Sequence, residues 1–93
     1  VNIVINQLQQ QKSNLCCQDV IRLLTQLGFE VRDGKLGGHK IYSHTGLTAF
    51  YSGSFNCGHG KNPEVRTAYI TKIIQVLKMH RHEILHYLGE END

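Results

Sequence analysis

Three short segments with strand character lie between two segments with helical periodicity, and this order limits the folds open to the chain. In the first of them, apolar Phe29 and Val31 alternate with charged residues, which is the pattern of a half-buried strand. Glycine-containing turns separate the segments, because glycine reaches the backbone conformations that tight turns need. The three expected strands are residues 29–33, 39–44 and 47–52.

Amphipathic helices are expected on both sides of these strands. The first begins at Ser13, a favoured N-cap residue, and runs to Leu27, where Gly28 ends it. The second begins at Asn62-Pro63, because asparagine favours the N-cap position and proline the first helical position. Its apolar stripe consists of Val65, Tyr69, Ile73, Val76, Leu77, His80 and Ile84.

These segments predict an α+β domain with the element order α-β-β-β-α. Short connections make neighbouring strands antiparallel, and a small sheet needs one face covered, here by two helices on one face. This order is similar to that of double-stranded-RNA-binding domains, with an extended C-terminal helix. We expect a single domain over residues 13–93, preceded by an N-terminal extension, residues 1–12, that fits either an edge strand or a helix.

Composition and charge fit a globular domain with a basic segment. The chain has 93 residues, 40% of them hydrophobic and 19% charged, which is typical of globular proteins. No apolar run approaches the ~20 residues that a membrane-spanning helix needs, so we expect no membrane association and a cytoplasmic protein. The net charge of +2 hides an uneven distribution, with one acid, Glu64, among the basic residues Lys61, Arg66, Lys72, Lys78 and Arg81.

The three cysteines give no pairing pattern, since their number is odd and Cys16 and Cys17 are adjacent. We expect free thiols in a reducing compartment. Cys16 lies on the apolar side of the first helix and is expected in the core, whereas Cys17 is expected on the surface.

Residues 82–86 have the His-Glu-x-x-His pattern with which zinc peptidases hold a catalytic metal on a helix. A catalytic site needs a third protein ligand, but the position where metzincins carry it is Asn92, a poor zinc ligand. Short motifs also arise by chance in a chain with six histidines. We therefore expect His82, Glu83 and His86 on the solvated side of the C-terminal helix, and no metal site.

Residues 28–44, GFEVRDGKLGGHKIYSH, resemble the HicA family of bacterial toxin ribonucleases. In that family a helix runs into a Gly-Phe pair, and a small-residue and His motif opens the second strand, followed by an aromatic residue and often a second His. The likeness covers about residues 15–78. The matching residues are Leu24, Leu27, Gly28, Phe29, Arg32, Gly38, His39, Tyr42 and His44.

The resemblance implies an endoribonuclease that cuts mRNA without a metal ion or other cofactor. It assigns the catalytic role to His39, and it implies a HicB-type antitoxin protein as partner. Side chains alone can support such chemistry, because the 2′-OH of RNA can attack the adjacent phosphate. Histidine suits the proton transfer, since the ordinary pKa of its imidazole, about 6.5, lies near working pH.

Further RNA-contacting residues are expected on the second strand. Gly38, directly before the expected catalytic histidine, lets the backbone approach a phosphate closely because it has no Cβ. Strand alternation places Ile41 on the helix-covered face in one of two phases. In that phase the open face carries Lys40, Tyr42 and His44, which suit phosphate contact and base stacking. The reverse phase, with Tyr42 in the core, stays open.

The loop before the last helix is a third expected contact site. His59 lies there between two glycines, and Lys61 follows close to the expected helix start. Helix N-termini attract anions, and a nearby lysine reinforces this for phosphate. We therefore expect His59 and Lys61 to bind RNA, and His59 is also a candidate for the second proton-transfer group.

Two other functions fit parts of the sequence. A non-catalytic RNA-binding module would use the same basic loop and open sheet face, but its function would not depend on His39. A small zinc-binding domain would use Cys57, His59 and the C-terminal histidines, although ligands at this spacing are a weak signal.

Overall fold

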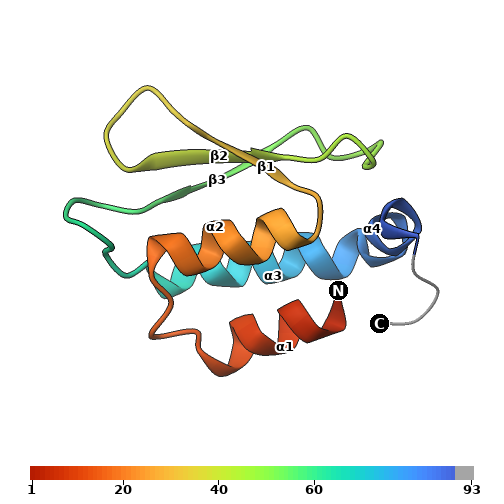
Figure 1. Ribbon diagram of the computed structural model, residues 1–93, viewed down its shortest axis with the longest axis horizontal. Coiled ribbons are helices and arrows are strands. Elements are labelled where there is room, and N and C mark those ends of the chain that lie inside the picture. Colours follow the sequence, from red (N-terminus) through yellow and green to blue (C-terminus); the bar gives the residue numbers. More distant parts are fainter. Residues whose placement is uncertain (90–93) are drawn as a thin grey trace.

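The computed structural model describes residues 1–89 and confirms an α+β arrangement with the order α-β-β-β-α (Figure 1). A further helix precedes this order, and two helices end it. The elements are α1 (Asn2–Gln10), α2 (Cys17–Gln26), β1 (Glu30–Asp33), β2 (His39–Ser43), β3 (Gly53–Asn56), α3 (Thr67–Met79) and α4 (Arg81–Leu88). Within the described residues, no helix combines the length and the apolar character needed to cross a membrane.

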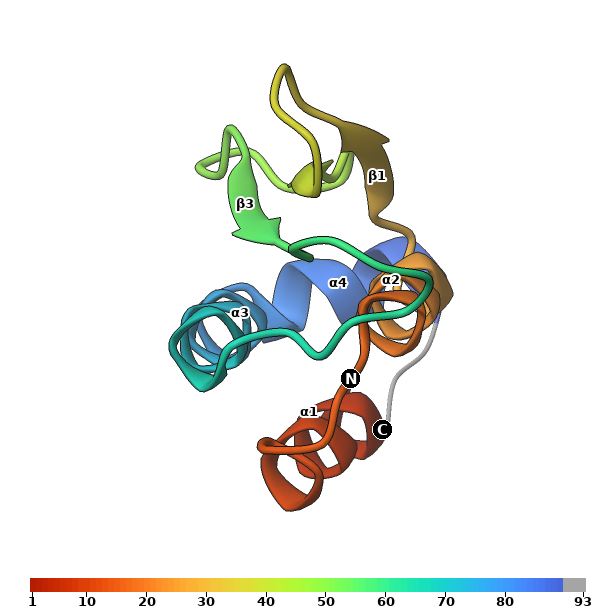
Figure 2. The ribbon, with the colours of Figure 1, turned by 90° about the vertical axis from the view of Figure 1, so that its left-hand side faces the viewer.

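The three strands form an antiparallel sheet in the order β1-β2-β3. One face of the sheet lies over α2 and α3, and the other face is open (Figure 2). We call these the inner and the outer face. Arg32, Ile41 and Ser54 are register partners in one row across the sheet. This row belongs to the outer face, because its neighbours in the alternation, such as Tyr42, are buried.

The main core lies between the inner face and the helices. Tyr42 and Phe55 enter it from the sheet, and both side chains are fully buried. Gly53, the register partner of Tyr42, leaves room for the tyrosine ring, because a Cβ there would lie 2.3 Å from the ring carbon Cζ. The helices contribute Val20, Leu23, Leu24, Ile70, Ile73 and Leu77. Burial of this apolar surface is the dominant favourable contribution to folding.

Residues 1–12 contain helix α1, which forms a third layer on the side of the helices away from the sheet (Figure 2). Val4, Ile5 and Leu8 are its buried residues, and the helix contacts α3. Arg81 of α4 also donates a hydrogen bond from Nε to the side-chain oxygen of Asn2 at 2.9 Å. The N-terminal segment is therefore packed onto the rest of the chain.

The third strand lies later than the sequence predicted, at 53–56 instead of 47–52. Residues 47–52 form a loop because their side chains bind elsewhere. Leu47 is buried, Thr48 is hydrogen-bonded to Glu83 of α4, and the Phe50 ring stacks on Tyr42 with 5.8 Å between centroids. These contacts pull the segment towards the helices and away from the sheet register.

The second predicted helix begins at Thr67, not at Asn62-Pro63. Residues 62–65 instead run beside the start of α2. The backbone N–H of Cys17 donates to the Pro63 carbonyl at 2.9 Å, and the side-chain oxygen of Asn62 accepts from the N–H of Gln18 at 3.0 Å. Asn62 does satisfy a helix N-terminus, but it is that of α2.

The C-terminal helical region is divided at His80 into α3 and α4. His80 is a buried polar residue, and its Nδ1 lies 3.1 Å from Oε1 of Glu83. The expected extension beyond Lys78 is therefore present, but as a separate helix. It ends at Gly89, whose φ of 73° is the left-handed conformation that favours glycine at helix ends.

Two of the cysteines form a disulfide, Cys17–Cys57, so the expectation of free thiols throughout is wrong. The expected environments of the adjacent cysteines are also reversed, since Cys17 is buried and Cys16 is partly exposed. The reason is that α2 begins at Cys17, which leaves Cys16 as N-cap. There the Cys16 side chain accepts from the backbone N–H of Asp19. In return the Asp19 carboxylate accepts from the backbone N–H of Cys16 at 3.0 Å.

Candidate functional site

The outer face of the sheet carries a shallow cavity of about 350 Å³ beside the expected catalytic histidine. Arg32 and Ile41 form its floor from the row described above, and His39 occupies the neighbouring row on β2. The loop before β3 adds Tyr51, whose side chain is 93% exposed. The remaining lining residues are Ser52, Gly53 and Ser54. A cation, an imidazole and an aromatic ring thus meet on one open surface.

Two glycines determine how His39 sits at the start of β2. Its ring lies over Gly34, where a Cβ would come within 2.1 Å of Nδ1. The N–H of Gly34 donates to the His39 carbonyl at 2.8 Å and closes the β1–β2 connection. Gly38 has φ of 79°, and a Cβ there would lie 2.5 Å from the Gly58 carbonyl oxygen. A side chain at position 34 would therefore displace the histidine ring, and one at position 38 would clash with the backbone at Gly58.

The face expected for Lys40, Tyr42 and His44 is wrong, because the strand has the reverse phase. Tyr42 is 1% exposed and His44 5% exposed, whereas Ile41 lies on the outer face. The alternation of a strand moves all three residues together. Aromatic packing favours this phase, since the Tyr42 ring lies 5.7 Å from that of Phe29. Burial raises the pKa of Tyr42 to about 12. Tyr42 and His44 are thus placed where RNA does not reach them.

Lys40 is held on the inner side of the sheet end. Its ammonium group pairs with the carboxylate of Asp33, and its side chain is 22% exposed. With Gly38 and Lys61 it lines a small pocket of about 210 Å³ next to the disulfide. Lys61 itself is exposed, but α3 starts only at Thr67. The expected placement of Lys61 at the start of the last helix is therefore wrong, and it lies instead close to Cys17 and Gln18, the first residues of α2.

His59 lies close to the loop that precedes His39. A Cβ on Gly37 would come 3.8 Å from the His59 ring carbon Cε1. The loop that carries His59 is fixed at its base, because Cys57 is disulfide-bonded and the Asn56 side chain accepts from the N–H of Gly58 at 2.7 Å. The loop that carries His59 thus meets the loop before His39 at one end of the molecule.

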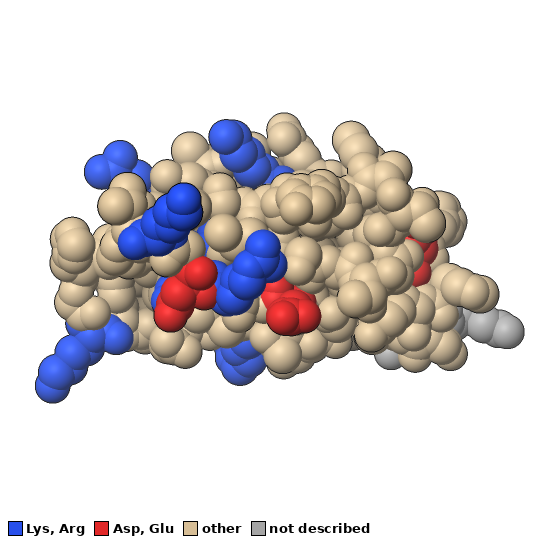
Figure 3. Space-filling model, turned by 90° about the horizontal axis from the view of Figure 1, so that it is seen from above, with Lys and Arg blue, Asp and Glu red and all other residues tan. Residues whose placement is uncertain are grey.

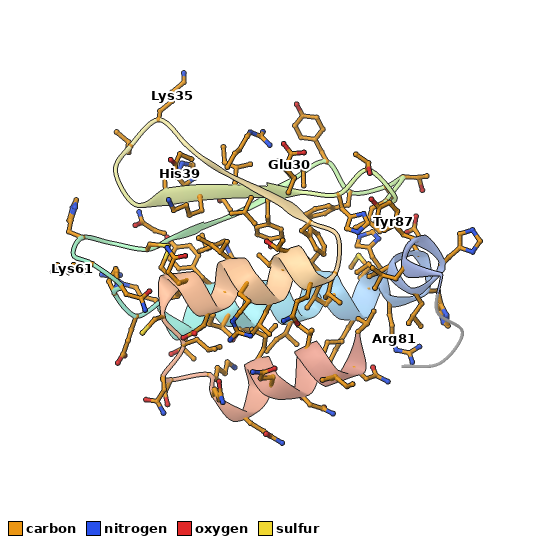
Figure 4. All side chains as sticks on the ribbon, viewed as in Figure 1. Glu30, Lys35, His39, Lys61, Arg81 and Tyr87 are labelled. Carbon is orange, nitrogen blue, oxygen red and sulfur yellow. A yellow bond between two sulfur atoms is a disulfide. The ribbon has the colours of Figure 1, made fainter. Side chains whose placement is uncertain are left out.

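Basic side chains concentrate at this end. Lys35, His39 and Lys61 lie at the end of the molecule opposite Tyr87 and Arg81 (Figure 4). In the view onto the outer face, Lys and Arg gather over the half that holds the β1–β2 loop (Figure 3). Among the described residues visible there, the other half carries none. Acidic side chains lie among them in the same view, so this half carries charges of both signs, whereas its basic side chains have no counterpart among the described residues seen in the other half (Figure 3).

The His-Glu-x-x-His segment lies on α4, where its glutamate has a structural role. Oε2 of Glu83 accepts from the N–H and the hydroxyl of Thr48 at 3.2 and 3.1 Å, and Oε1 pairs with His80. His82 and His86 are exposed, as expected. Within residues 1–89, no group of three or more His, Cys, Asp or Glu side chains could hold a metal ion. Asn92 lies outside the described residues.

Tyr51 and Ser54 are outer-face residues that the sequence reasoning missed. The phase of β1 was readable, because Phe29 and Val31 alternate with Arg32. The position of β3 was not readable, and this hid the register that brings Ser54 next to Ile41. A scan of family models, curated proteins and solved structures finds no match to the chain. Its function must therefore be argued from its own residues and geometry.

Proposed function

We propose that this chain is a HicA-like endoribonuclease that cuts mRNA without a metal ion, with His39 as the proton-transfer residue. One observation carries the proposal. His39 lies on the open face of the sheet, in one cavity with Arg32, at the end of the molecule where basic side chains gather. This arrangement offers a proton acceptor or donor and a positive charge to the same phosphodiester.

The chemistry needs little beyond these groups. In RNA the 2′-OH is the nucleophile, and its attack on the adjacent phosphorus expels the 5′-oxygen of the next nucleotide. His39 removes the proton from the 2′-OH, and the guanidinium of Arg32 stabilises the charge that grows on the phosphate oxygens. The products are a 2′,3′-cyclic phosphate and a 5′-OH. DNA lacks the 2′-OH nucleophile and should therefore not be cut.

A second proton-transfer group is needed to protonate the leaving 5′-oxygen. We propose His59 for this role, and the closeness of its loop to the loop before His39 supports the proposal. Lys61, two residues further along, is exposed and available for a phosphate of the same strand. Lys40 is less suited, since Asp33 already pairs with it.

A non-catalytic RNA-binding module is the second candidate, and one observation favours it. Within the described residues, the imidazole of His39 makes no hydrogen bond, so no carboxylate or carbonyl fixes its orientation. Catalytic histidines commonly have such a partner. A module that binds RNA through Arg32 and the basic end would not need a hydrogen-bond partner for His39.

The proposal includes a HicB-type antitoxin protein as partner, as the resemblance implies. It also includes a cytoplasmic location, since mRNA is the proposed substrate. Thiols are kept reduced in that compartment. Cys17 and Cys57 would then be present there as thiols, with hydrogen bonds and packing holding the two segments together. The bond from the Cys17 N–H to the Pro63 carbonyl, at 2.9 Å, is one such contact between the first turn of α2 and the segment that follows Cys57.

The test uses a single-stranded RNA and a copy carrying 2′-deoxynucleotides, each incubated with the purified chain in EDTA. We expect the RNA to be cut, with 2′,3′-cyclic phosphate ends, and the deoxy copy to stay intact. Cutting that stops in EDTA, or that proceeds equally on the deoxy copy, contradicts the mechanism. Binding of both strands without any cutting would establish the non-catalytic module instead.

A further inference from the structure

The residues that line the outer-face cavity suit a ligand that combines an anionic group with an aromatic ring. Its floor carries apolar Ile41 and the cation of Arg32, and its lining includes the exposed ring of Tyr51. Serine hydroxyls and the glycine backbone at 52–54 complete the lining. A volume of about 350 Å³ is of the size of small-ligand sites.

Arg32 is available to bind an anion. Within the described residues it has no ion pair, and its hydrogen bond from Nη1 to the Ser43 hydroxyl is long, at 3.4 Å. The acids nearby do not neutralise it. Asp33 points to the other face and pairs with Lys40, and Glu30 lies in the next row, opposite Ser43. A guanidinium in this state can donate hydrogen bonds to two phosphate oxygens side by side.

Tyr51 is available for stacking. Its side chain is 93% exposed, and its ring is absent from the aromatic contacts that bury Tyr42, Phe50 and Phe55 within the described residues. An exposed ring on a loop beside a cationic cavity is a stacking platform for a nucleobase. In a duplex the bases are stacked on each other, so only an unpaired base can use the platform.

We propose that the outer-face cavity binds one unstacked nucleotide of single-stranded RNA, with Arg32 on its phosphate and Tyr51 on its base. The position next to His39 would place the adjoining phosphodiester at the proton-transfer group. The inference rests on the proposed function, and it adds two things. It restricts the substrate to single strands, and it makes Tyr51 a binding residue for the base.

The test measures the dissociation constant of a fluorescein-labelled single-stranded RNA of mixed sequence, in EDTA, by fluorescence anisotropy. All variants carry His39→Ala, so that the RNA is not consumed. Tyr51→Ala should weaken binding about 5- to 150-fold, as expected for loss of one stacked base, and Tyr51→Phe should retain it. Arg32→Ala should weaken binding and lower the slope of log Kd against log salt by about 0.7, one phosphate contact.

Lys78→Ala is the matched control, because it removes one exposed positive charge from α3, behind the sheet. Its affinity should stay close to that of the background variant. Circular dichroism establishes that each variant is folded. The same RNA, annealed to its complement, should bind more weakly and should not respond to Tyr51→Ala.

The outcomes separate this inference from the proposed function. If wild type cuts RNA but Arg32→Ala and Tyr51→Ala bind it as the Lys78→Ala control does, the nucleotide site is overturned and the ribonuclease stands. If nothing is cut but both variants lose affinity as expected, the site stands and the catalytic proposal fails. Equal dependence of duplex binding on Tyr51 also overturns the single-strand assignment.

Discussion

His44 joins the end of α2 to the turn after β2 through a hydrogen bond to Leu27. Its Nε2 donates to the Leu27 carbonyl at 2.8 Å, and its Nδ1 accepts from the N–H of Gly46 at 3.0 Å. These two contacts fix the orientation of the imidazole, with Nε2 as donor and Nδ1 as acceptor. The rings of Phe29 and Tyr87 pack against it at centroid distances of 4.7 and 4.5 Å. His44 therefore has a structural role, connecting the end of α2 to the turn after β2.

His44→Ala should therefore reduce stability and leave RNA binding by the folded protein unchanged. The substitution leaves the Leu27 carbonyl and the Gly46 N–H without their partner and creates a cavity between two rings. We expect a loss of about 2–4 kcal/mol in the free energy of unfolding. Urea unfolding measures this loss. A variant as stable as wild type but with weakened RNA binding would contradict the structural role.

Glu83 gives the stability a dependence on pH in the acid range. The hydrogen bond from His80 lowers the pKa of Glu83 below its ordinary value of 4.5, and the N–H of Thr48 acts in the same direction. A carboxyl with a lower pKa in the folded state binds protons more weakly there than in the unfolded state. Its contribution is therefore complete well above pH 4.5 and is lost as the pH falls below that value.

Glu83→Gln should consequently flatten the fall in the free energy of unfolding below about pH 4.5. Urea unfolding at a series of pH values measures this for wild type and variant. At neutral pH the variant should be the less stable of the two, since the pairing with His80 is lost. Parallel pH profiles for the two proteins would show that the carboxylate contributes nothing to folding.

The Cys17–Cys57 disulfide should stabilise the domain without being required for the fold. It closes a sequence separation of 40 residues, for which a contribution of about 2–4 kcal/mol is typical. The paired variant Cys17→Ala with Cys57→Ala should lose this amount and should still fold. Urea unfolding of the oxidised, the reduced and the variant protein measures it, with Cys16→Ala as control. Complete unfolding on reduction would contradict this prediction and a cytoplasmic role.

Removing the negative charge of Glu30 should strengthen RNA binding at low salt. Glu30 lies on the outer face in the row beside that of Arg32, so it repels a phosphate bound there. We expect Glu30→Gln to lower the Kd about two- to fivefold at low salt, with the difference vanishing as salt screens the charge. Glu64→Gln, outside the outer face, serves as comparison. An unchanged Kd at low salt would argue against RNA on this face.

The arrangement of helices and strands was readable from periodicity, because alternation and helical spacing record which side chains are buried. β1 and β2 were placed nearly to the residue, and the phase of β1 followed from Phe29 and Val31. The phase of β2 was not determined. Lys40, Ile41, Tyr42 and a neighbouring serine have no clear alternation, and only the pairing with the aromatic core decides which of them points inwards.

The features that sequence reasoning missed all depend on contacts between distant segments. Thr48 lies in a loop because its N–H is hydrogen-bonded to Glu83. Asn62 caps the helix that begins at Cys17. The disulfide depends on the same approach of residues 62–65 to α2. For the candidate site, His39 lies at the strand start as expected and is half-buried, whereas the ring of Tyr51 was hidden within an expected strand.

The most direct test of the central claim is the single-turnover rate of RNA cleavage in EDTA by wild type, His39→Ala and His82→Ala. His82 is an exposed histidine on α4, so its variant controls for the loss of an imidazole as such. We predict that His39→Ala lowers the rate about 10²- to 10⁴-fold with RNA binding retained, while His82→Ala cuts like wild type. Equal rates for wild type and His39→Ala would contradict the account.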